Sequence, residues 1–161
     1  MRRDAVDADA ERLDRRQARV VSSLLFRIVA LPVLVTLLCR SIPALAATRP
    51  ILEAGAVALA LFPFFAAWGR LMAVRIALGR SRADRGDWAA AERLLTPIGR
   101  TLAARVFDGA GEGRYHLALA FEADGRGAPA RRLFTQLASE VGERSEWGRL
   151  AGEAARLEQR P

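Results

Sequence analysis

Residues able to carry out chemistry are scarce in this chain of 161 residues, which has one histidine, His116, and one cysteine, Cys39. A single cysteine cannot form an internal disulfide, and by itself it cannot make a thiolate metal site. His116 stands beside Tyr115 on a predicted helix, with no second type of metal ligand nearby. A surface or groove histidine fits this setting better than a catalytic one. We therefore expect no enzyme activity and no catalytic, cofactor or metal site.

A glycine-rich segment at residues 109–113 is the nearest approach to a phosphate-binding loop. Such a loop, G-x-x-x-x-G-K-[ST], needs a lysine and a preceding apolar strand. The chain contains no lysine, because all its basic residues are arginine. The segment is therefore predicted to be a linker between helices.

The net charge of +7 comes from arginines that are spread along the chain and flank its apolar segments. This distribution is typical of membrane topology signals and of attraction to anionic lipid headgroups. We therefore expect membrane lipids as partners and no nucleic acid.

Two apolar segments, residues 20–39 and 51–69, dominate the first half of the chain and are separated by a hinge at residues 40–50. Each contains one charge, Arg27 in the first and Glu53 in the second. At about 1.5 Å rise per residue, each is long enough to cross a hydrocarbon core of roughly 30 Å as a helix. The sequence therefore predicts a transmembrane hairpin over residues 20–69.

Two alternatives to a hairpin stay open. Helices in the core of a soluble bundle usually keep a polar stripe, whereas residues 28–38 and 54–68 carry no charge on any face. A signal peptide would explain the small-x-small sequence Ala44-Leu45-Ala46. Against it, the leader at residues 1–19 is rich in acids and the apolar run is long.

The arginines near the ends of the spans predict the orientation. Basic residues stay on the cytoplasmic side of a membrane. The leader contains six arginines and the segment just after the second span contains five, against two in the hinge. We therefore expect an integral protein of a bacterial inner membrane with both termini in the cytoplasm.

Charges and small residues within the spans suggest how the hairpin packs. Arg27 can extend toward the cytoplasmic headgroups, while Glu53 lies close to the outer end, so the two are not expected to pair. Ala54, Gly55 and Ala58 are predicted to let the two helices approach closely, as small residues at four-residue spacing do.

After residue 70 the pattern changes to amphipathic helices broken by glycine-rich turns. A cytoplasmic helical domain over residues 70–161 is predicted, in which Pro97 bends its helix or ends it early and Ser145 caps the last helix. The predicted helices cover residues 71–85, 88–105, 114–124, 128–141 and 146–158.

The turn glycines Gly86 and Gly125 are 39 residues apart, and setting them in register aligns two helical hairpins. These hairpins resemble the tetratricopeptide (TPR) repeat family, whose pattern is W-x2-L-G-x2-Y…A-x3-F…P with a period of about 34 residues. A longer linker at residues 108–113 accounts for the difference in period. The matching positions are Leu78-Gly79 and Ala91-x3-Leu95 in the first unit, and Leu117-Ala118, Phe121 and Ala130-x3-Phe134 in the second.

The chain departs from the TPR pattern at three arginines. Arg75 and Arg114 stand where the first aromatic residue is expected, and Arg82 replaces the second aromatic of the first unit. Two repeats are fewer than the three or so that usually bury a continuous core. The last predicted helix is therefore expected to act as a capping helix. Two spans followed by TPR-like hairpins also look like the architecture of the two-span TPR protein of bacterial haem-biosynthesis operons.

The resemblance implies a membrane-anchored adaptor or scaffold that binds a protein or peptide partner at the cytoplasmic face. The alternative is an accessory structural subunit that packs against a larger membrane complex through its hairpin. In TPR arrays the first helix of each hairpin lines the concave face. An equally open alternative has Tyr115 packed inside the core and Arg80 facing lipid headgroups. The partner-binding residues expected from the register are Ile76, Arg80, Tyr115, Leu119 and Glu122.

Overall fold

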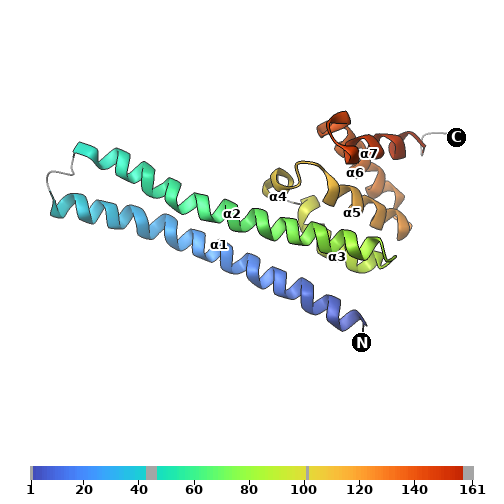
Figure 1. The fold of residues 1–161 in the computed structure, drawn as a ribbon, viewed down its shortest axis with the longest axis horizontal. Helices are drawn as coiled ribbons and strands as arrows, with labels where there is room; N and C mark the ends of the chain where they lie inside the picture. Colours follow the sequence, from blue (N-terminus) through green and yellow to red (C-terminus); the bar gives the residue numbers. More distant parts are fainter. Residues whose placement is uncertain (1, 43–46, 101, 158–161) are drawn as a thin grey trace. The chain divides into compact units, whose positions relative to one another are not determined.

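A computed structural model describes residues 2–42, 47–100 and 102–157 of the chain (Figure 1). Throughout these residues the structure consists of helices and turns without any strand, which confirms the predicted all-α fold. A short 3-10 helix, η2 (Gly142–Arg144), precedes the last helix. The α-helices are α1 (Arg2–Ser41), α2 (Arg49–Ala83), α3 (Trp88–Arg100), α4 (Leu102–Phe107), α5 (Glu112–Ala123), α6 (Gly127–Glu140) and α7 (Glu146–Leu157).

The chain divides into two compact units. One is Glu11–Leu71, and the other combines Met1–Ala10 with Met72–Pro161. Helix α2 is continuous through the division, so the prediction of a separate helix starting at residue 71 is wrong. Gly69 is isolated among good helix formers, and a single glycine weakens a helix without ending it.

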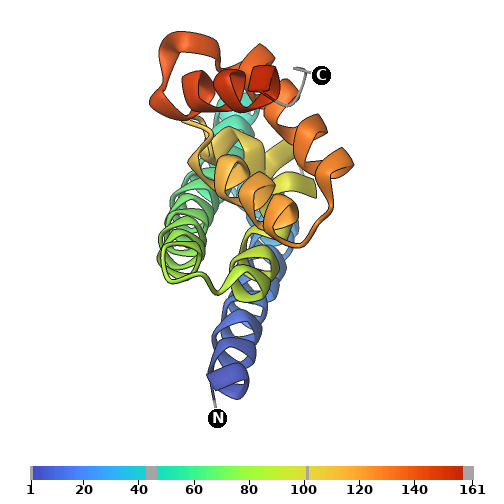
Figure 2. The same cartoon turned by 90° about the vertical axis from the view of Figure 1, so that its right-hand side faces the viewer.

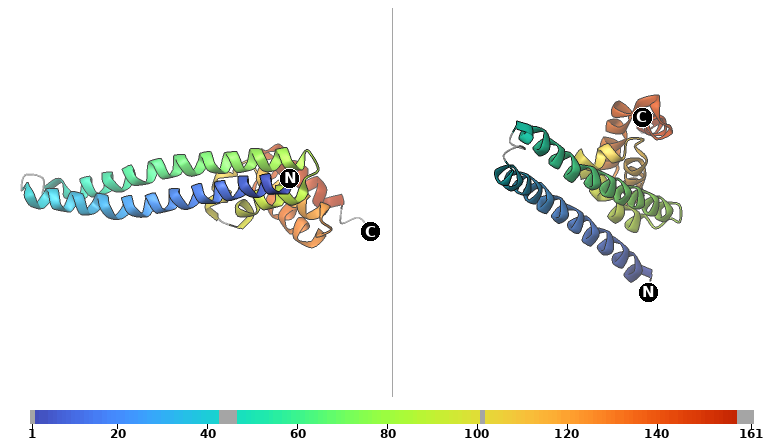
Figure 3. Two further views of the ribbon diagram at one scale, coloured as in Figure 1. Left: turned by 90° about the horizontal axis from the view of Figure 1, so that it is seen from below. Right: turned by 60° about the vertical axis from the view of Figure 1, so that its left-hand side comes forward.

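In the Glu11–Leu71 unit, α1 and α2 lie side by side as an antiparallel hairpin (Figures 1 and 3). Both helices are long and apolar enough to cross a membrane, with mean hydropathies of 2.3 and 1.8 over their most apolar windows. Large apolar side chains are exposed along both, among them Phe26, Val29, Leu59 and Phe62. The small-x-small sequence at residues 44–46 lies outside the described residues.

The close approach within the hairpin does not use the predicted small residues. Ala54, Gly55 and Ala58 are exposed, and a Cβ added to Gly55 would meet nothing within 4 Å. The buried small residues are Ala56 and Ala60, which lie on the opposite face of α2 from Ala54 and Ala58. Two overlapping sets of small residues have the same four-residue spacing, and only one set faces α1.

The helical domain contains two hairpins that close with the same turn. In α2–α3, Gly86 adopts a φ of 72° and its N–H donates to Ala83 O at 2.8 Å. In α5–α6, Gly125 adopts a φ of 73° and its N–H donates to Glu122 O at 2.9 Å. The next amide also bonds back across each turn, to Arg82 O at 3.0 Å in the first and to Phe121 O at 2.8 Å in the second. In these two bonds of each turn, the backbone follows the predicted alignment of the two hairpins.

Packing within the two hairpins also follows the alignment, and helices α3, α5, α6 and α7 pack each against the next (Figure 2). Gly79 lies directly against the Leu95 side chain. A Cβ at residue 79 would come within 2.5 Å of that side chain, so only glycine fits without a shift. Ala118 and Phe134 are fully buried at the matching positions of the second hairpin. The side chains of Leu137 and Ala151 complete the buried cluster between α6 and α7.

Local signals fix the ends of the remaining helices. Pro97 lies inside α3, three residues before the last residue of that helix that the structure describes, and α4 begins at Leu102. Ser145 caps α7 as expected, since its Oγ accepts a hydrogen bond from Gly148 N at 3.1 Å. The same hydroxyl donates to Ala110 O at 2.7 Å and thereby ties α7 to the loop before α5.

Candidate functional site

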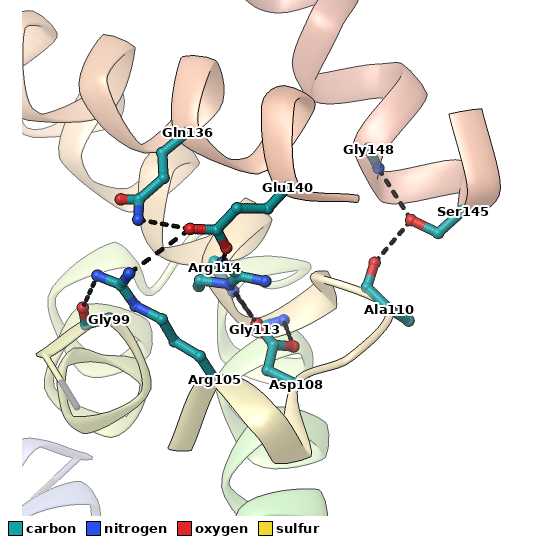
Figure 4. Close-up of polar contacts among 10 residues, drawn as sticks. All are labelled: Gly99, Arg105, Asp108, Ala110, Gly113, Arg114, Gln136, Glu140, Ser145 and Gly148. Carbon is teal, nitrogen blue, oxygen red and sulfur yellow. Dashed lines mark hydrogen bonds and ion pairs between the residues drawn. The ribbon is translucent and has the colours of Figure 1, made fainter. Parts of the chain in front are cut away.

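A buried aspartate fixes the start of α5. The Asp108 side chain is 2% exposed, and its two carboxylate oxygens accept hydrogen bonds from Gly113 N at 2.9 Å and Arg114 N at 3.1 Å (Figure 4). The first-turn N–H groups of a helix have no partner within the helix. The Asp108 carboxylate accepts hydrogen bonds from two of these N–H groups, although it lies outside the helix, and so holds the loop against the first turn. Burial raises the pKa of this carboxyl, while the hydrogen bonds from Gly113 and Arg114 oppose the rise.

Arg114 links Asp108 to the end of α6. Its Nε donates to Asp108 Oδ2 at 3.1 Å, and its Nη1 bonds Glu140 (Figure 4). Glu140 also accepts from Gln136 at 2.7 Å and lies 3.6 Å from Arg105. Burial opposes ionisation of Glu140, but the hydrogen bonds from Arg114 and Gln136 lower its pKa overall. This network joins α4, α5 and α6 around one buried guanidinium.

Arg75 is a second buried arginine, 1% exposed, at the position that matches Arg114 in the alignment. Its Nη1 lies 3.5 Å from Leu94 O on α3. Both arginines stand where the TPR pattern has an aromatic residue. Each fills an interior position with the alkyl stem of its side chain and turns its guanidinium to buried polar groups.

Beside the start of α5 lies a groove of about 450 Å³. Its floor is apolar and includes Ile76 from α2 and Phe107 from the end of α4. Its rim carries Arg80, Asp84 and Glu112, one cation and two carboxylates. The groove also includes Ala73, Ala77 and Ser81.

Arg80 is not an isolated cation in this groove. Its Nη1 lies 3.0 Å from Glu112 Oε1, and its Nε lies 3.8 Å from Asp84 Oδ2. Its guanidinium carbon also stands 5.9 Å from the centre of the Trp147 ring, within range of a cation–π contact. A ligand carboxylate would therefore have to compete with two acidic side chains for Arg80.

An aromatic cluster adjoins Arg80. The Tyr115 ring lies 5.7 Å from Phe134 and 5.4 Å from Trp147, measured between ring centres. Burial raises the pKa of Tyr115, and Glu122 and Glu153 add to the rise. His116 packs against the same rings and is 6% exposed, so the expectation of a surface or groove histidine is wrong.

His116 is kept neutral by its surroundings. Neither ring nitrogen has a hydrogen-bond partner among the described residues. Burial lowers its pKa, although Glu112 and Asp84 act in the opposite direction. A neutral, enclosed imidazole with no partner acts here as a packing group of the aromatic cluster.

The predicted partner-binding residues separate into two groups. Ile76 and Arg80 line the groove. Tyr115 and Leu119 are half-buried and pack against the core cluster, while Glu122 is exposed near the end of α5. Tyr115 thus takes the interior position that the alternative interpretation gave it.

Sequence reasoning missed three residues at this site, namely Phe107, Glu112 and Trp147. Phe107 ends α4 and Glu112 begins α5, on either side of the glycine-rich turn between the two helices, and Trp147 lies in the first turn of α7. An aromatic residue and an acid on either side of a glycine-rich linker was the available signal. In the described part of the chain, no three His, Cys, Asp or Glu side chains gather to hold a metal ion.

The chain was compared with models of protein families, with curated proteins and with solved structures, and no match was found.

Proposed function

We propose that this protein is a membrane-anchored adaptor that holds a protein partner at the cytoplasmic face of a bacterial inner membrane. The exposed apolar surface of the hairpin supports the anchoring. The core helix of a soluble protein would be mostly buried, whereas the most apolar window of α1 is 0% buried. Such a surface is unfavourable in water, because exposing apolar side chains to water costs free energy, and this cost is absent in lipid.

The groove beside α5 carries the binding role in this proposal. It combines an apolar floor, formed in part by Ile76 and Phe107, with a rim on which carboxylates outnumber cations. Apolar side chains supply affinity, while a few placed charges supply orientation and specificity. The segment that fits this groove presents an apolar side chain to the floor and a basic side chain to Asp84 and Glu112.

The test is selection of random peptides on the full-length protein in lipid nanodiscs. We expect enrichment of peptides with an arginine or lysine next to an apolar residue. In the variant Asp84→Asn with Glu112→Gln this enrichment should disappear, because the rim then carries only the cation. The fold should persist, since both acids contribute only exposed or half-exposed ion pairs, each worth about 0 to 1 kcal/mol.

The matched control is Glu143→Gln with Glu146→Gln, which removes the same charge from exposed positions outside the groove. This variant should select the same peptides as the wild type. Enrichment of acidic peptides, or equal loss in both variants, would reject the groove as the binding surface.

The orientation of the hairpin is a second expected result. Eleven arginines flank the spans on the side of the two termini, against two in the hinge, so both termini should be cytoplasmic. With Cys39 replaced by serine, a cysteine at Thr48 should react with a membrane-impermeant maleimide added outside intact cells. A cysteine at Ala89 should react only after lysis, and labelling of Ala89→Cys from outside would contradict the orientation.

A further inference from the structure

A cleft of about 330 Å³ opens between α1 and α2 within the Glu11–Leu71 unit. One wall carries Arg19, Ser23 and Arg27 from α1. These three side chains recur every four residues and therefore share one face of the helix, over about 12 Å of its length. The opposite wall is apolar and includes Pro63 and Phe64 from α2. One side of the cleft thus carries positive charge and a hydroxyl group, and the other side is apolar.

The two arginines of the cleft are not neutralised by the protein. No hydrogen bond or ion pair joins Arg19 or Arg27 to another residue in the described part of the chain. The unit contains three acidic residues, Glu11, Asp14 and Glu53, and none of them lines the cleft. Glu53 instead pairs with Arg49 at 2.7 Å. Within the described residues, the positive charge of the cleft therefore has no acidic partner.

The position of the cleft along α1 indicates a source for an anionic partner. Arg19 directly precedes the apolar run of α1, and Arg27 stands two turns further into it. In an anchored hairpin this is the level where lipid headgroups give way to acyl chains. An arginine inside a span is costly unless it is paired or reaches the headgroups, and a phosphate oxygen pair matches the planar fork of a guanidinium.

We propose that this cleft is a binding site for an anionic glycerophospholipid. The lipid phosphate lies between the guanidinium groups of Arg19 and Arg27, and the Ser23 hydroxyl donates a hydrogen bond to one of its oxygens. An acyl chain follows the apolar wall past Phe64. A zwitterionic headgroup is disfavoured, because it would place its own cation beside two arginines with no acid at hand. The inference rests on the proposed membrane anchoring.

Trp68 provides a local readout of the bound lipid. Phe64 lies on the apolar wall, and the centre of the Trp68 ring is 5.5 Å from the centre of the Phe64 ring. Lipids with brominated acyl chains quench tryptophan fluorescence on contact, and a Trp68→Phe variant supplies the background from the other two tryptophans. The full-length protein is reconstituted in phosphatidylcholine containing an equal minor fraction of either brominated phosphatidylglycerol or brominated phosphatidylcholine. We expect stronger quenching of Trp68 by the anionic lipid.

The variant Arg19→Gln with Arg27→Gln should lose this preference while both lipids still quench Trp68. The matched control, Arg12→Gln with Arg16→Gln, removes two exposed arginines of the same helix that lie outside the cleft. General attraction to an anionic surface is about equal for every nearby arginine. The control should therefore bind anionic membranes more weakly overall but keep the preference at Trp68.

Three other outcomes would each overturn the inference. Equal loss of preference in both variants would mean diffuse surface attraction, with the anchoring intact. Loss of the preference on adding soluble glycerol phosphate would mean a site for small phosphate esters, again with the anchoring intact. No quenching of Trp68 by either lipid would mean that the hairpin is not inserted, and the proposed anchoring would fall with the lipid site.

Discussion

Replacing Arg114 with methionine should lower the free energy of unfolding of the helical domain by about 3 to 5 kcal/mol, the loss typical of removing one partner of a buried ion pair. Methionine keeps much of the apolar volume, so the loss comes from Asp108, which is 2% exposed and would keep a charge without its cation. Glu140 would lose its bond to the same guanidinium. Urea unfolding followed by tryptophan fluorescence measures the change.

The pH dependence separates this cause from a simple packing defect. Burial already raises the pKa of Asp108, and removal of Arg114 would raise it further. A raised pKa means that protonation stabilises the folded state, an effect present at acid pH and lost as pH rises through the folded pKa. The difference between wild type and Arg114→Met should therefore be smaller at pH 4 than at pH 7.

A double variant, Arg114→Met with Asp108→Asn, removes both charges of the pair. It should recover part of the loss, because replacing both partners of a buried pair is far less costly than replacing one. A loss that is the same at both pH values and is not reduced in the double variant would show that packing, and not an unpaired carboxylate, sets the stability at this position.

Phe134→Ala should be the next most damaging change, with an expected loss of about 3 to 5 kcal/mol for a large side chain removed from a closed core. Phe134 is 0% exposed, belongs to the cluster between α6 and α7, and lies 5.7 Å from the Tyr115 ring. Hydrogen exchange of the α5 and α6 amides should accelerate together, because both helices close on this ring.

Leu157→Ala is the matched control for Phe134→Ala, since Leu157 is 67% exposed at the end of α7. A surface change of this kind is usually worth within about 0.5 kcal/mol. If the two variants lost similar stability, the cluster around Phe134 would not be the core of this domain.

Most helices of the domain could be predicted because glycines mark their ends. The predicted segments 114–124 and 128–141 correspond to Glu112–Ala123 and Gly127–Glu140. Between them Gly125 adopts a positive φ that other residues rarely tolerate. The continuity of α2 was not predictable in the same way. A lone glycine and a change from apolar to amphipathic pattern suggest a break, but they do not interrupt backbone hydrogen bonding.

The packing faces were harder to predict than the helices. Ala54 with Ala58 and Ala56 with Ala60 have equal spacing in a stretch that is apolar on every side. Nothing in the sequence of α2 distinguishes the face toward α1 from the face toward the surroundings. In the amphipathic helices the charged face removes this ambiguity, and Ala91 and Ala130, which the alignment put at equivalent positions, are both fully buried.

The groove could be predicted only in part, because its residues come from three helices. Ile76 and Arg80 follow from the helical register of α2 alone. The contacts of Arg80 with Glu112 and Trp147 join residues that are far apart in the chain, and no spacing rule relates them. Tyr115 illustrates the same limit, since its ring contacts with Phe134 on α6 and Trp147 on α7 join residues that no spacing rule relates.

The two buried arginines, Arg75 and Arg114, limit which substitutions the domain can accept. On an exposed surface, exchange between arginine and lysine is close to neutral, and sequences drift freely between the two. At Arg75 and Arg114 a lysine would keep the charge but lose the planar group that reaches buried oxygen atoms from a fixed angle. We therefore expect relatives of this sequence to vary at most of its arginines and to retain these two, which stand at equivalent positions of two hairpins, 39 residues apart.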